Sequence, residues 1–424
     1  MQQAPLFSVV IPTRNRAHLL RNALQSVLWQ SFDDYELIVS DNCSADNTAD
    51  VVSEIGGDRV RVVRPDRMLS MPDHWEFALN HARGRFVTYL CDDDAWAPEA
   101  LARVSQVLDS SDSKLVVLSA GHYYAPNWLD PNRRNVATFA PYTGEVREHR
   151  SHETLRQLYD TSGIVNESPR MLNSFCERET LLRVRAAAGK IFLLCPDYSF
   201  AALVPTEIPT WLYIDELLLV MGVFPEGIGS TQIFNRGESA REFVREFKED
   251  RLLRHVPLKS SLVTNFVTET LIMCQESLPK LAGYDLSWVQ YFVNCWTDMM
   301  VLKRNGVDVT ADKEEFFRVL AEQPASVRER VNTVVNCPDG RDPGEEWARR
   351  HPVRATVRSA IDNSTLLSNV ESFFRTRSAH RPKDYGPSTL VSGATAGFSN
   401  ILECARKLHG LARPEFVDAA RLEA

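Results

Sequence analysis

Residues 86–99 read FVTYLCDDDAWAPE, and this stretch decides the fold. The apolar run 86–91 predicts a buried strand, and Pro98 predicts the first turn of a helix. Between them stand three consecutive carboxylates, Asp92, Asp93 and Asp94. This order places an acidic cluster at the carboxyl end of a strand, where open α/β sheets bind their ligands.

Strand and helix patterns alternate over roughly the first 120 residues. Strands are predicted at residues 7–11, 35–39, 60–63, 86–91 and 114–118, with helical spacing of apolar residues between them. Strands separated by single helices pair in parallel through right-handed crossovers. The predicted fold class is therefore α/β, a Rossmann-like, mostly parallel sheet with flanking helices.

The rest of the chain changes character twice. Residues 123–169 are irregular apart from one helix at about 153–159, and residues 170–235 are again mixed α/β. From residue 236 the apolar spacing is mainly helical. We therefore predict one domain over residues 1–235, with halves at about 1–120 and 121–235. A mainly helical C-terminal region of unknown role follows over residues 236–424.

Bulk composition narrows the function classes. A net charge of −8 over 424 residues disfavours a protein that binds nucleic acid electrostatically. No apolar stretch approaches the ~20 residues that cross a bilayer. Eight cysteines without a CxxC pair are typical of a reducing compartment. We predict a cytoplasmic protein, with peripheral association at the inner face of a membrane left open.

Two polar loops follow the first two predicted strands. Pro12 ends the first strand, and Thr13, Arg14 and Asn15 supply hydroxyl, guanidinium and amide groups suited to a nucleotide. Asp41 follows the second strand and is suited to a nucleobase N–H or a ribose hydroxyl. The alternatives are an ordinary strand–helix turn and an Asx turn that caps the next helix.

The triplet of aspartates is suited to a divalent cation. Mg²⁺ and Mn²⁺ use one or two protein carboxylates together with phosphate oxygens. Such an ion neutralises the charge that develops on a leaving diphosphate. One or two of the three carboxylates would then bind metal, and another would accept from sugar hydroxyls. The alternative is a solvated acidic turn.

A further carboxylate, Asp197, precedes a helical apolar pattern about a hundred residues later. Across a cleft it would act as general base toward an acceptor hydroxyl. Its alternative role is a helix cap.

Four segments, 9–16, 37–48, 82–87 and 92–99, occur in the order typical of one known family. Over about residues 7–230 the chain resembles the family 2 glycosyltransferases, inverting enzymes of GT-A fold. The resemblance implies a metal-dependent enzyme that uses Mn²⁺ or Mg²⁺ and a nucleotide-activated sugar. The sequence departs from the family at Pro196, which replaces a more usual acidic neighbour of the base.

The resemblance also implies roles for individual residues. The nucleotide-sugar would contact Pro12, Thr13, Arg14, Asn15, Asp41, Asp92 and Asp93. Asp93 and Asp94 would hold the metal, and Asp197 would be the catalytic base.

The implied reaction moves a sugar from a nucleoside-diphosphate sugar, with a UDP-sugar favoured, to a hydroxyl acceptor. The acceptor would be a glycan, a lipid-linked molecule or a small molecule, in polysaccharide, lipopolysaccharide or other glycoconjugate biosynthesis. The helical C-terminal region could form a homo-oligomer, and no nucleic-acid partner is expected.

Two other function classes stay open at this point. A nucleotidyltransferase would share the parallel sheet and acidic metal site. Residues 12–16, however, lack the glycines of its phosphate-binding loop. The second class is a non-catalytic nucleotide-sugar-binding or scaffold protein that works through its helical region.

Overall fold

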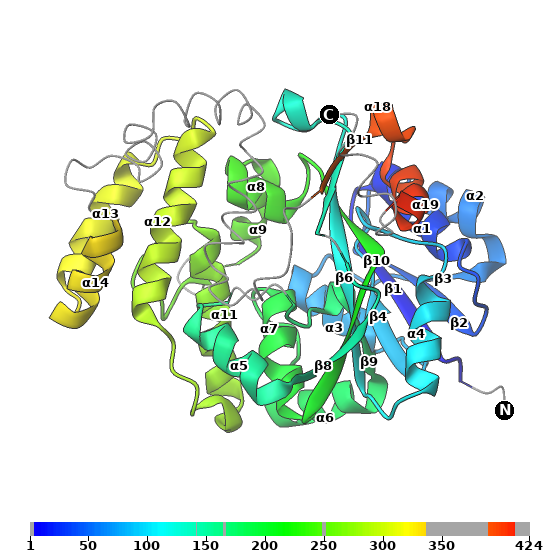
Figure 1. Ribbon diagram of the computed structural model, residues 1–424, viewed down its shortest axis with the longest axis horizontal. Coiled ribbons are helices and arrows are strands. Elements are labelled where there is room, and N and C mark those ends of the chain that lie inside the picture. Colours follow the sequence, from blue (N-terminus) through cyan, green and yellow to red (C-terminus); the bar gives the residue numbers. More distant parts are fainter. Residues whose placement is uncertain (1–3, 141, 164–166, 248–251, 336–388, 412–424) are drawn as a thin grey trace.

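The computed structural model describes residues 4–140, 142–163, 167–247, 252–335 and 389–411 (Figure 1). Its centre is a mixed sheet in the order β11-β7-β6-β9-β4-β1-β2-β3. A further strand, β10, pairs with β6 of this order and also with β5 and β8. The strands are β1 (Phe7–Thr13), β2 (Tyr35–Asp41), β3 (Val60–Val63), β4 (Phe86–Tyr89), β5 (Ala95–Trp96), β6 (Leu115–Tyr124), β7 (Val136–Phe139), β8 (Val146–Arg150), β9 (Ser174–Glu177), β10 (Thr210–Val223) and β11 (Thr389–Ser392).

The four strands β4, β1, β2 and β3 pair in parallel, as predicted. The fifth predicted strand is longer than expected and does not continue this parallel set. Instead β9 lies between β4 and β6 and is antiparallel to both, with Cys176 opposite Val87 and Leu115. The sequence pattern missed this because β9 has only four residues and comes from a distant segment.

Side chains of β1 alternate between the two faces of the sheet. Val9 and Ile11 pack against α1 (Ala17–Leu28), α2 (Thr48–Gly56) and α4 (Ala100–Asp109). Val10 packs in a second core, on the opposite face. The helices of that core are α3 (Met71–Leu79), α5 (Ser151–Asp160), α6 (Arg178–Ala188) and α7 (Pro196–Leu203). The predicted α/β fold class, a Rossmann-like GT-A sheet with flanking helices, is confirmed. The sheet is mixed and not mostly parallel, because only four of the ten strand pairings among the described residues are parallel.

Beyond residue 235 the described chain is mainly helical, as predicted (Figure 1). After α8 (Ile228–Phe234), the helices are α9 (Glu238–Glu246), α11 (Val263–Ser277), α12 (Trp288–Arg304), α13 (Thr310–Ala321) and α14 (Ala325–Val335). Phe292, Met299 and Phe316 belong to a core of their own, whereas Leu271 and Cys274 of α11 join the core around α7. The helical region is therefore docked onto the sheet layers through α11.

The last described segment returns to the sheet. β11 pairs antiparallel with β7, and α18 (Gly393–Ala396) and α19 (Ile401–Leu411) follow it. Ile401 and Cys404 pack with Leu19 and Leu217. The domain boundary at residue 235 stays a prediction, and part of the predicted helical region, residues 336–388 and 412–424, lies outside the described residues.

Short 3-10 turns connect several elements. They are η1 (Gly57–Arg59), η2 (Pro131–Arg133), η3 (Met171–Asn173), η4 (Val204–Thr206) and η5 (Pro279–Leu281).

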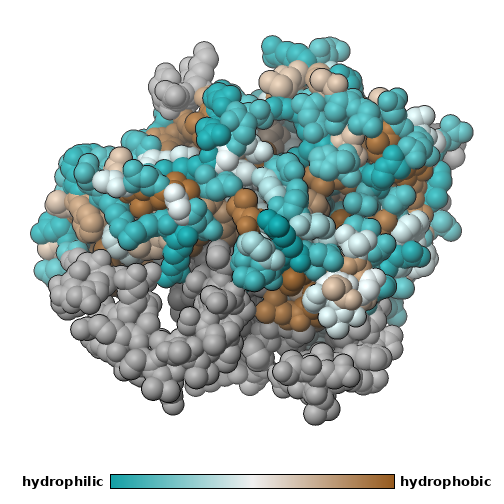
Figure 2. All heavy atoms as spheres, turned by 90° about the horizontal axis from the view of Figure 1, so that it is seen from above, coloured by the Kyte–Doolittle hydropathy of each residue, from teal (hydrophilic) through white to brown (hydrophobic). Residues whose placement is uncertain are grey.

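None of the described helices is long and apolar enough to cross a bilayer. On the face drawn in Figure 2, hydrophilic residues cover most of the described surface and hydrophobic residues form separate groups.

Candidate functional site

The carboxyl ends of β1, β2 and β4 meet at one edge of the sheet, because these strands are parallel and adjacent. We refer to this edge as the carboxyl edge. Thr13 lies beside Asp41 in the strand register, and the Thr13 hydroxyl donates to Oδ2 of Asp92 at 2.7 Å. The structure therefore brings together the three polar segments that the sequence placed at strand ends.

Asp92 is fully engaged by the protein. Its Oδ1 accepts from Arg16 at 3.0 Å, its Oδ2 accepts from Thr13, and the residue is 4% exposed. Arg16 also donates to the backbone oxygen of Glu226 at 2.8 Å. Asp92 thus fixes the loop after β4 to the loop after β1, and its predicted contact with the nucleotide-sugar stays a prediction.

The loop after β1 is locked to the loop after β2. Asn15 adopts φ 55°, a conformation that asparagine tolerates better than most residues. Its backbone N–H donates to Ser44 Oγ at 2.9 Å, and its Oδ1 accepts from the Ala45 N–H at 2.7 Å. Asn15 is therefore a connector of the two loops in this structure.

Arg14 points to the helical region. Its guanidinium forms an ion pair with Glu246 of α9, and Glu242 of the same helix lies 3.8 Å away. A nucleotide that uses Arg14 would have to compete with these carboxylates.

Asp41 is also held by its neighbours. Its Oδ1 accepts from the Ser44 N–H at 2.8 Å, and its Oδ2 is paired with Arg64. Asp41 therefore forms a local turn, but this turn does not cap the next helix, because α2 begins only at Thr48. Asp46 accepts the first N–H groups of two helices, from Ala17 of α1 at 2.9 Å and Thr48 of α2 at 3.1 Å.

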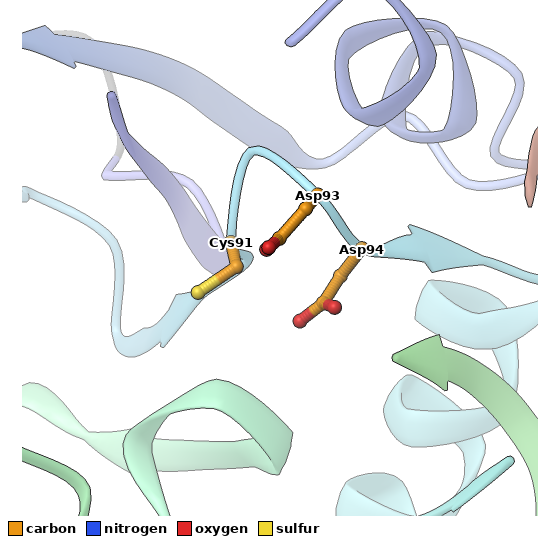
Figure 3. Close-up of side chains that lie close together, drawn as sticks. All are labelled: Cys91, Asp93 and Asp94. Atoms are coloured by element: carbon orange, nitrogen blue, oxygen red, sulfur yellow. The ribbon is translucent and has the colours of Figure 1, made fainter. Parts of the chain in front are cut away.

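Asp93 and Asp94 extend from the loop after β4 on the same side as Cys91 (Figure 3). One ligand atom from each of the three side chains lies within 4.8 Å of the others. Burial raises the pKa of Asp93 to about 6, although Arg16 lowers it, and Asp92 adds to the rise. Burial, followed by the charge of Asp93, raises the pKa of Asp94 well above its usual value.

Gly222 of β10 lies against the loop after β4, residues 90–94, which we call the acidic loop. Its N–H donates to Oδ1 of Asp94 at 2.8 Å. A Cβ at this position would lie 1.9 Å from the backbone oxygen of Asp93, so the close approach requires glycine.

These residues fit a divalent cation. Two neighbouring carboxylates held out of water repel each other, and a cation between them would remove that cost. Carboxylate oxygens are the ligands that Mg²⁺ and Mn²⁺ prefer. Cys91 is a poorer candidate, because burial and the adjacent aspartates raise the pKa of its thiol and keep it protonated. Asp93 and Asp94 are the residues that would hold the ion.

Asp197 lies in the first turn of α7, after Pro196. It is not the N-cap residue, which is Cys195. The backbone N–H of Leu172 donates to its carboxylate, while its buried Oδ1 has no hydrogen-bond partner among the described residues. Burial raises the pKa of Asp197 to about 6, against the lowering effect of Arg170.

Asp197 acts electrostatically on the acidic loop. Its charge contributes to the raised pKa of both Asp94 and Cys91. The site therefore combines two close carboxylates on the loop after β4 with a third, partly unsatisfied one on α7.

Sequence reasoning missed several residues here. Gly222 was not assigned to the site, and Cys91 was only the last residue of the predicted strand 86–91. Arg170 and Glu246 gave no local signal, because each acts on residues distant in the chain.

The fold is that of an α/β domain of GT-A type. Residues 8–173 match the family model described as "Glycosyl transferase family 2".

Two curated relatives each match about a quarter of the chain. One is the "GalNAc(5)-diNAcBac-PP-undecaprenol beta-1,3-glucosyltransferase" of Campylobacter jejuni, 38% identical over 105 residues, which are 24% of this chain and 34% of that protein. Another is the "UDP-Glc:alpha-D-GlcNAc-diphosphoundecaprenol beta-1,3-glucosyltransferase WfgD" of Escherichia coli, 31% identical over 26% of this chain and 43% of that protein. The chain thus spans less than half the length of these relatives.

Among solved structures, S. aureus TarS 1-349 in complex with UDP-GlcNAc is 14% identical. The similarity covers 77% of this chain and 90% of that one, with a TM-score of 0.41.

Proposed function

We propose that this protein is an inverting glycosyltransferase. It moves a sugar from a nucleoside-diphosphate sugar, with a UDP-sugar favoured, to a hydroxyl acceptor in polysaccharide, lipopolysaccharide or other glycoconjugate biosynthesis. The family match supports the reaction class. The name of the Escherichia coli relative includes UDP-Glc, which supports the donor. Both names include an undecaprenol-linked sugar, which supports a lipid-linked acceptor.

The observation that carries the proposal is the buried Oδ1 of Asp197, which has no hydrogen-bond partner in the part of the chain that the structure describes. The charge of Asp197 also helps to raise the pKa of Asp94 in the acidic loop. A carboxylate with a free acceptor position and a raised pKa is suited to take a proton from a hydroxyl. As Asp197 takes that proton, the acceptor oxygen attacks the anomeric carbon from the face opposite the leaving nucleoside diphosphate. A single displacement inverts the configuration, because no glycosyl-enzyme intermediate forms.

Asp93 and Asp94 would hold Mn²⁺ or Mg²⁺. The bound ion would supply Lewis-acid neutralisation of the charge on the departing diphosphate. Gly222 orients Asp94 through its N–H, and Arg16 offsets part of the charge of Asp92 and Asp93. These contacts hold the acidic loop from two sides.

The nucleotide would bind along the carboxyl edge, at Pro12, Thr13, Arg14, Asn15, Asp41, Asp92 and Asp93. Asp41 and Asp92 are already bonded within the protein, so they would act by shaping the edge as well as by contact. With a lipid-linked acceptor, a cytoplasmic location at the inner face of a membrane is part of this proposal, and homo-oligomer formation stays a prediction.

Product analysis tests the proposed reaction. The purified chain is incubated with UDP-sugars, Mn²⁺ and a panel of acceptors, and products are followed by ³¹P and ¹H NMR. Release of UDP, with an anomeric configuration opposite to that of the donor, is the expected result. Release of pyrophosphate would indicate a nucleotidyltransferase, and binding without turnover would indicate a nucleotide-sugar-binding protein.

A further inference from the structure

Arg170 immediately precedes the turn η3, and this turn also contacts Asp197 on α7. The backbone N–H of Arg170 donates to Oδ1 of Asn173 at 2.9 Å, and Asn173 Nδ2 donates to the backbone oxygen of Leu118 in β6 at 3.4 Å. Leu172, in the same turn, donates its N–H to Asp197. One short turn anchored to β6 therefore positions both Arg170 and the proposed base.

The guanidinium of Arg170 stacks on the residue next to the base. Its Cζ lies 5.2 Å from the centroid of the Tyr198 ring. Stacking on an aromatic ring fixes the guanidinium while its N–H groups stay available at the edges. Within the described part of the chain, the Arg170 side chain forms no ion pair and donates no hydrogen bond. The side chain is thus held in place, and its donors are open to solvent, because no Arg170 nitrogen is among the buried polar atoms without a partner.

The arginines at the carboxyl edge are different. Arg16 is paired with Asp92, Arg64 with Asp41, and Arg14 with Glu246. In each case the fixed carboxylate neutralises the guanidinium. Arg170 is partly buried and has no such carboxylate partner among the described residues, so its guanidinium is open to a bound anion.

Arg170 acts on two titratable groups, the proposed base and a histidine of β6. It lowers the pKa of Asp197, and burial together with the charge of Arg170 lowers the pKa of His122 on β6 to about 4. His122 is therefore neutral near pH 7 and does not add a second positive charge. Arg170 supplies positive charge beside the base, where an acceptor hydroxyl has to approach.

We propose that Arg170 binds an anionic group of the acceptor, a phosphate or a carboxylate, and so selects charged acceptors over neutral ones. The inference rests on the proposed function, because it takes Asp197 to mark the acceptor side. A guanidinium fixed by Tyr198 can bind either anion through two parallel N–H donors. It also offsets the repulsion between that anion and Asp197.

Binding of small charged probes to the full chain tests this inference. The probes are α-D-glucose 1-phosphate, D-glucuronate and the neutral methyl α-D-glucopyranoside, measured by calorimetry in EDTA so that no metal binds the phosphate. The proteins are wild type, Arg170→Ala, Arg170→Lys and the control Arg330→Ala, which changes an exposed arginine of α14.

Wild type and the control should bind one charged probe at least about 10-fold more tightly than the neutral probe, the usual strength of a charged hydrogen bond. The probe that is preferred identifies phosphate or carboxylate. Arg170→Ala should lose the preference, and Arg170→Lys should keep part of it as a point charge. An equal affinity of wild type for all three probes would overturn the inference, as would a preference that survives in Arg170→Ala.

UDP binding in Mn²⁺ distinguishes a failure of the inference about Arg170 from a failure of the proposed function. Unchanged UDP affinity in Arg170→Ala shows that the variant is folded and that the loss is confined to the acceptor side. If wild type binds UDP and transfers sugar but shows no anion preference, the inference fails and the proposed function stands. If wild type neither binds UDP nor transfers sugar, the proposed function fails, and with it the acceptor role of Arg170.

Discussion

Two groups of acidic side chains lie close together in this protein and differ in what surrounds them. Asp41 and Asp92 have both carboxylate oxygens bonded within the protein, each with an arginine as one partner. Asp93, Asp94 and Asp197 are held out of water with less compensation, and the pKa of each is raised. The first group stabilises the loops, and the second group leaves carboxylates available to bind a ligand and to accept a proton.

The difference shows what a static structure can say about function. Compensated carboxylates stabilise the fold, because charged hydrogen bonds are favourable when both partners are in place. Uncompensated buried carboxylates destabilise it, and such a cost is expected at functional sites. Substitutions in the two groups should therefore have different effects on stability, ligand binding and turnover.

The largest effect is expected from Asp197→Asn. The amide keeps the shape but cannot accept the proton, so turnover should fall at least about 100-fold while UDP affinity in Mn²⁺ stays unchanged. Steady-state transfer and UDP calorimetry measure the two quantities, with Asp160→Asn at the exposed end of α5 as control. Near wild-type turnover by Asp197→Asn would assign the base elsewhere.

The pH dependence of transfer should follow the same carboxylate. The pKa of Asp197 is raised to about 6, and the base works only when deprotonated. The value of kcat/KM should therefore be level above that pH and fall about tenfold per pH unit well below it. A profile that stays flat down to pH 4.5 would show that no carboxylate of raised pKa limits the reaction.

Isosteric amides at Asp92 and Asp94 should have opposite effects on metal-free stability at pH 7.5. Asp92→Asn weakens the bonds from Arg16 and Thr13 and should cost about 1–3 kcal/mol in free energy of unfolding. In the unfolded chain Asp94 is ionised above its ordinary pKa of about 3.9, whereas folding raises its pKa, so ionisation opposes folding at pH 7.5.

Asp94→Asn removes that cost and can still accept from Gly222, so it should stabilise the protein by about 1 kcal/mol. Urea unfolding in EDTA measures both variants. Destabilisation by both substitutions would mean that Asp94 is a structural residue like Asp92.

The smallest effect is expected at the contact between α9 and Arg14. Glu246→Gln removes one carboxylate that competes with an anionic ligand for Arg14, so UDP affinity should rise about two- to fivefold. Glu238→Gln is the matched control, because Glu238 lies on the same helix but pairs with Arg241 and Arg245. Equal effects of the two variants would mean that the net charge of α9 matters and the contact with Arg14 does not.

The sequence predicted those parts of the site that depend on local pattern. Residues 7–11, 35–39 and 86–91 each combine an apolar run with a polar loop, and parallel pairing brings Thr13, Asp41 and Asp92 together. The helical character of the described part of the chain beyond residue 235 follows from apolar spacing in the same way.

Other features depend on contacts between distant segments. The four residues of β9 carry too little pattern to reveal insertion between β4 and β6. Nothing near Arg14 in the sequence points to Glu246, and nothing near Asp197 points to Arg170. Which carboxylate would be compensated depends on where each arginine lies, and that is set by the tertiary fold.

The most direct test of the account is how much Mn²⁺ strengthens UDP binding in wild type, Asp92→Asn and Asp94→Asn. The ratio of the UDP dissociation constants without and with Mn²⁺ removes any change in metal-independent affinity. We predict a ratio of at least about 10 for wild type and Asp92→Asn, and a ratio near 1 for Asp94→Asn. A ratio that survives in Asp94→Asn, or one that Asp92→Asn abolishes equally, would contradict the division between the two groups of carboxylates.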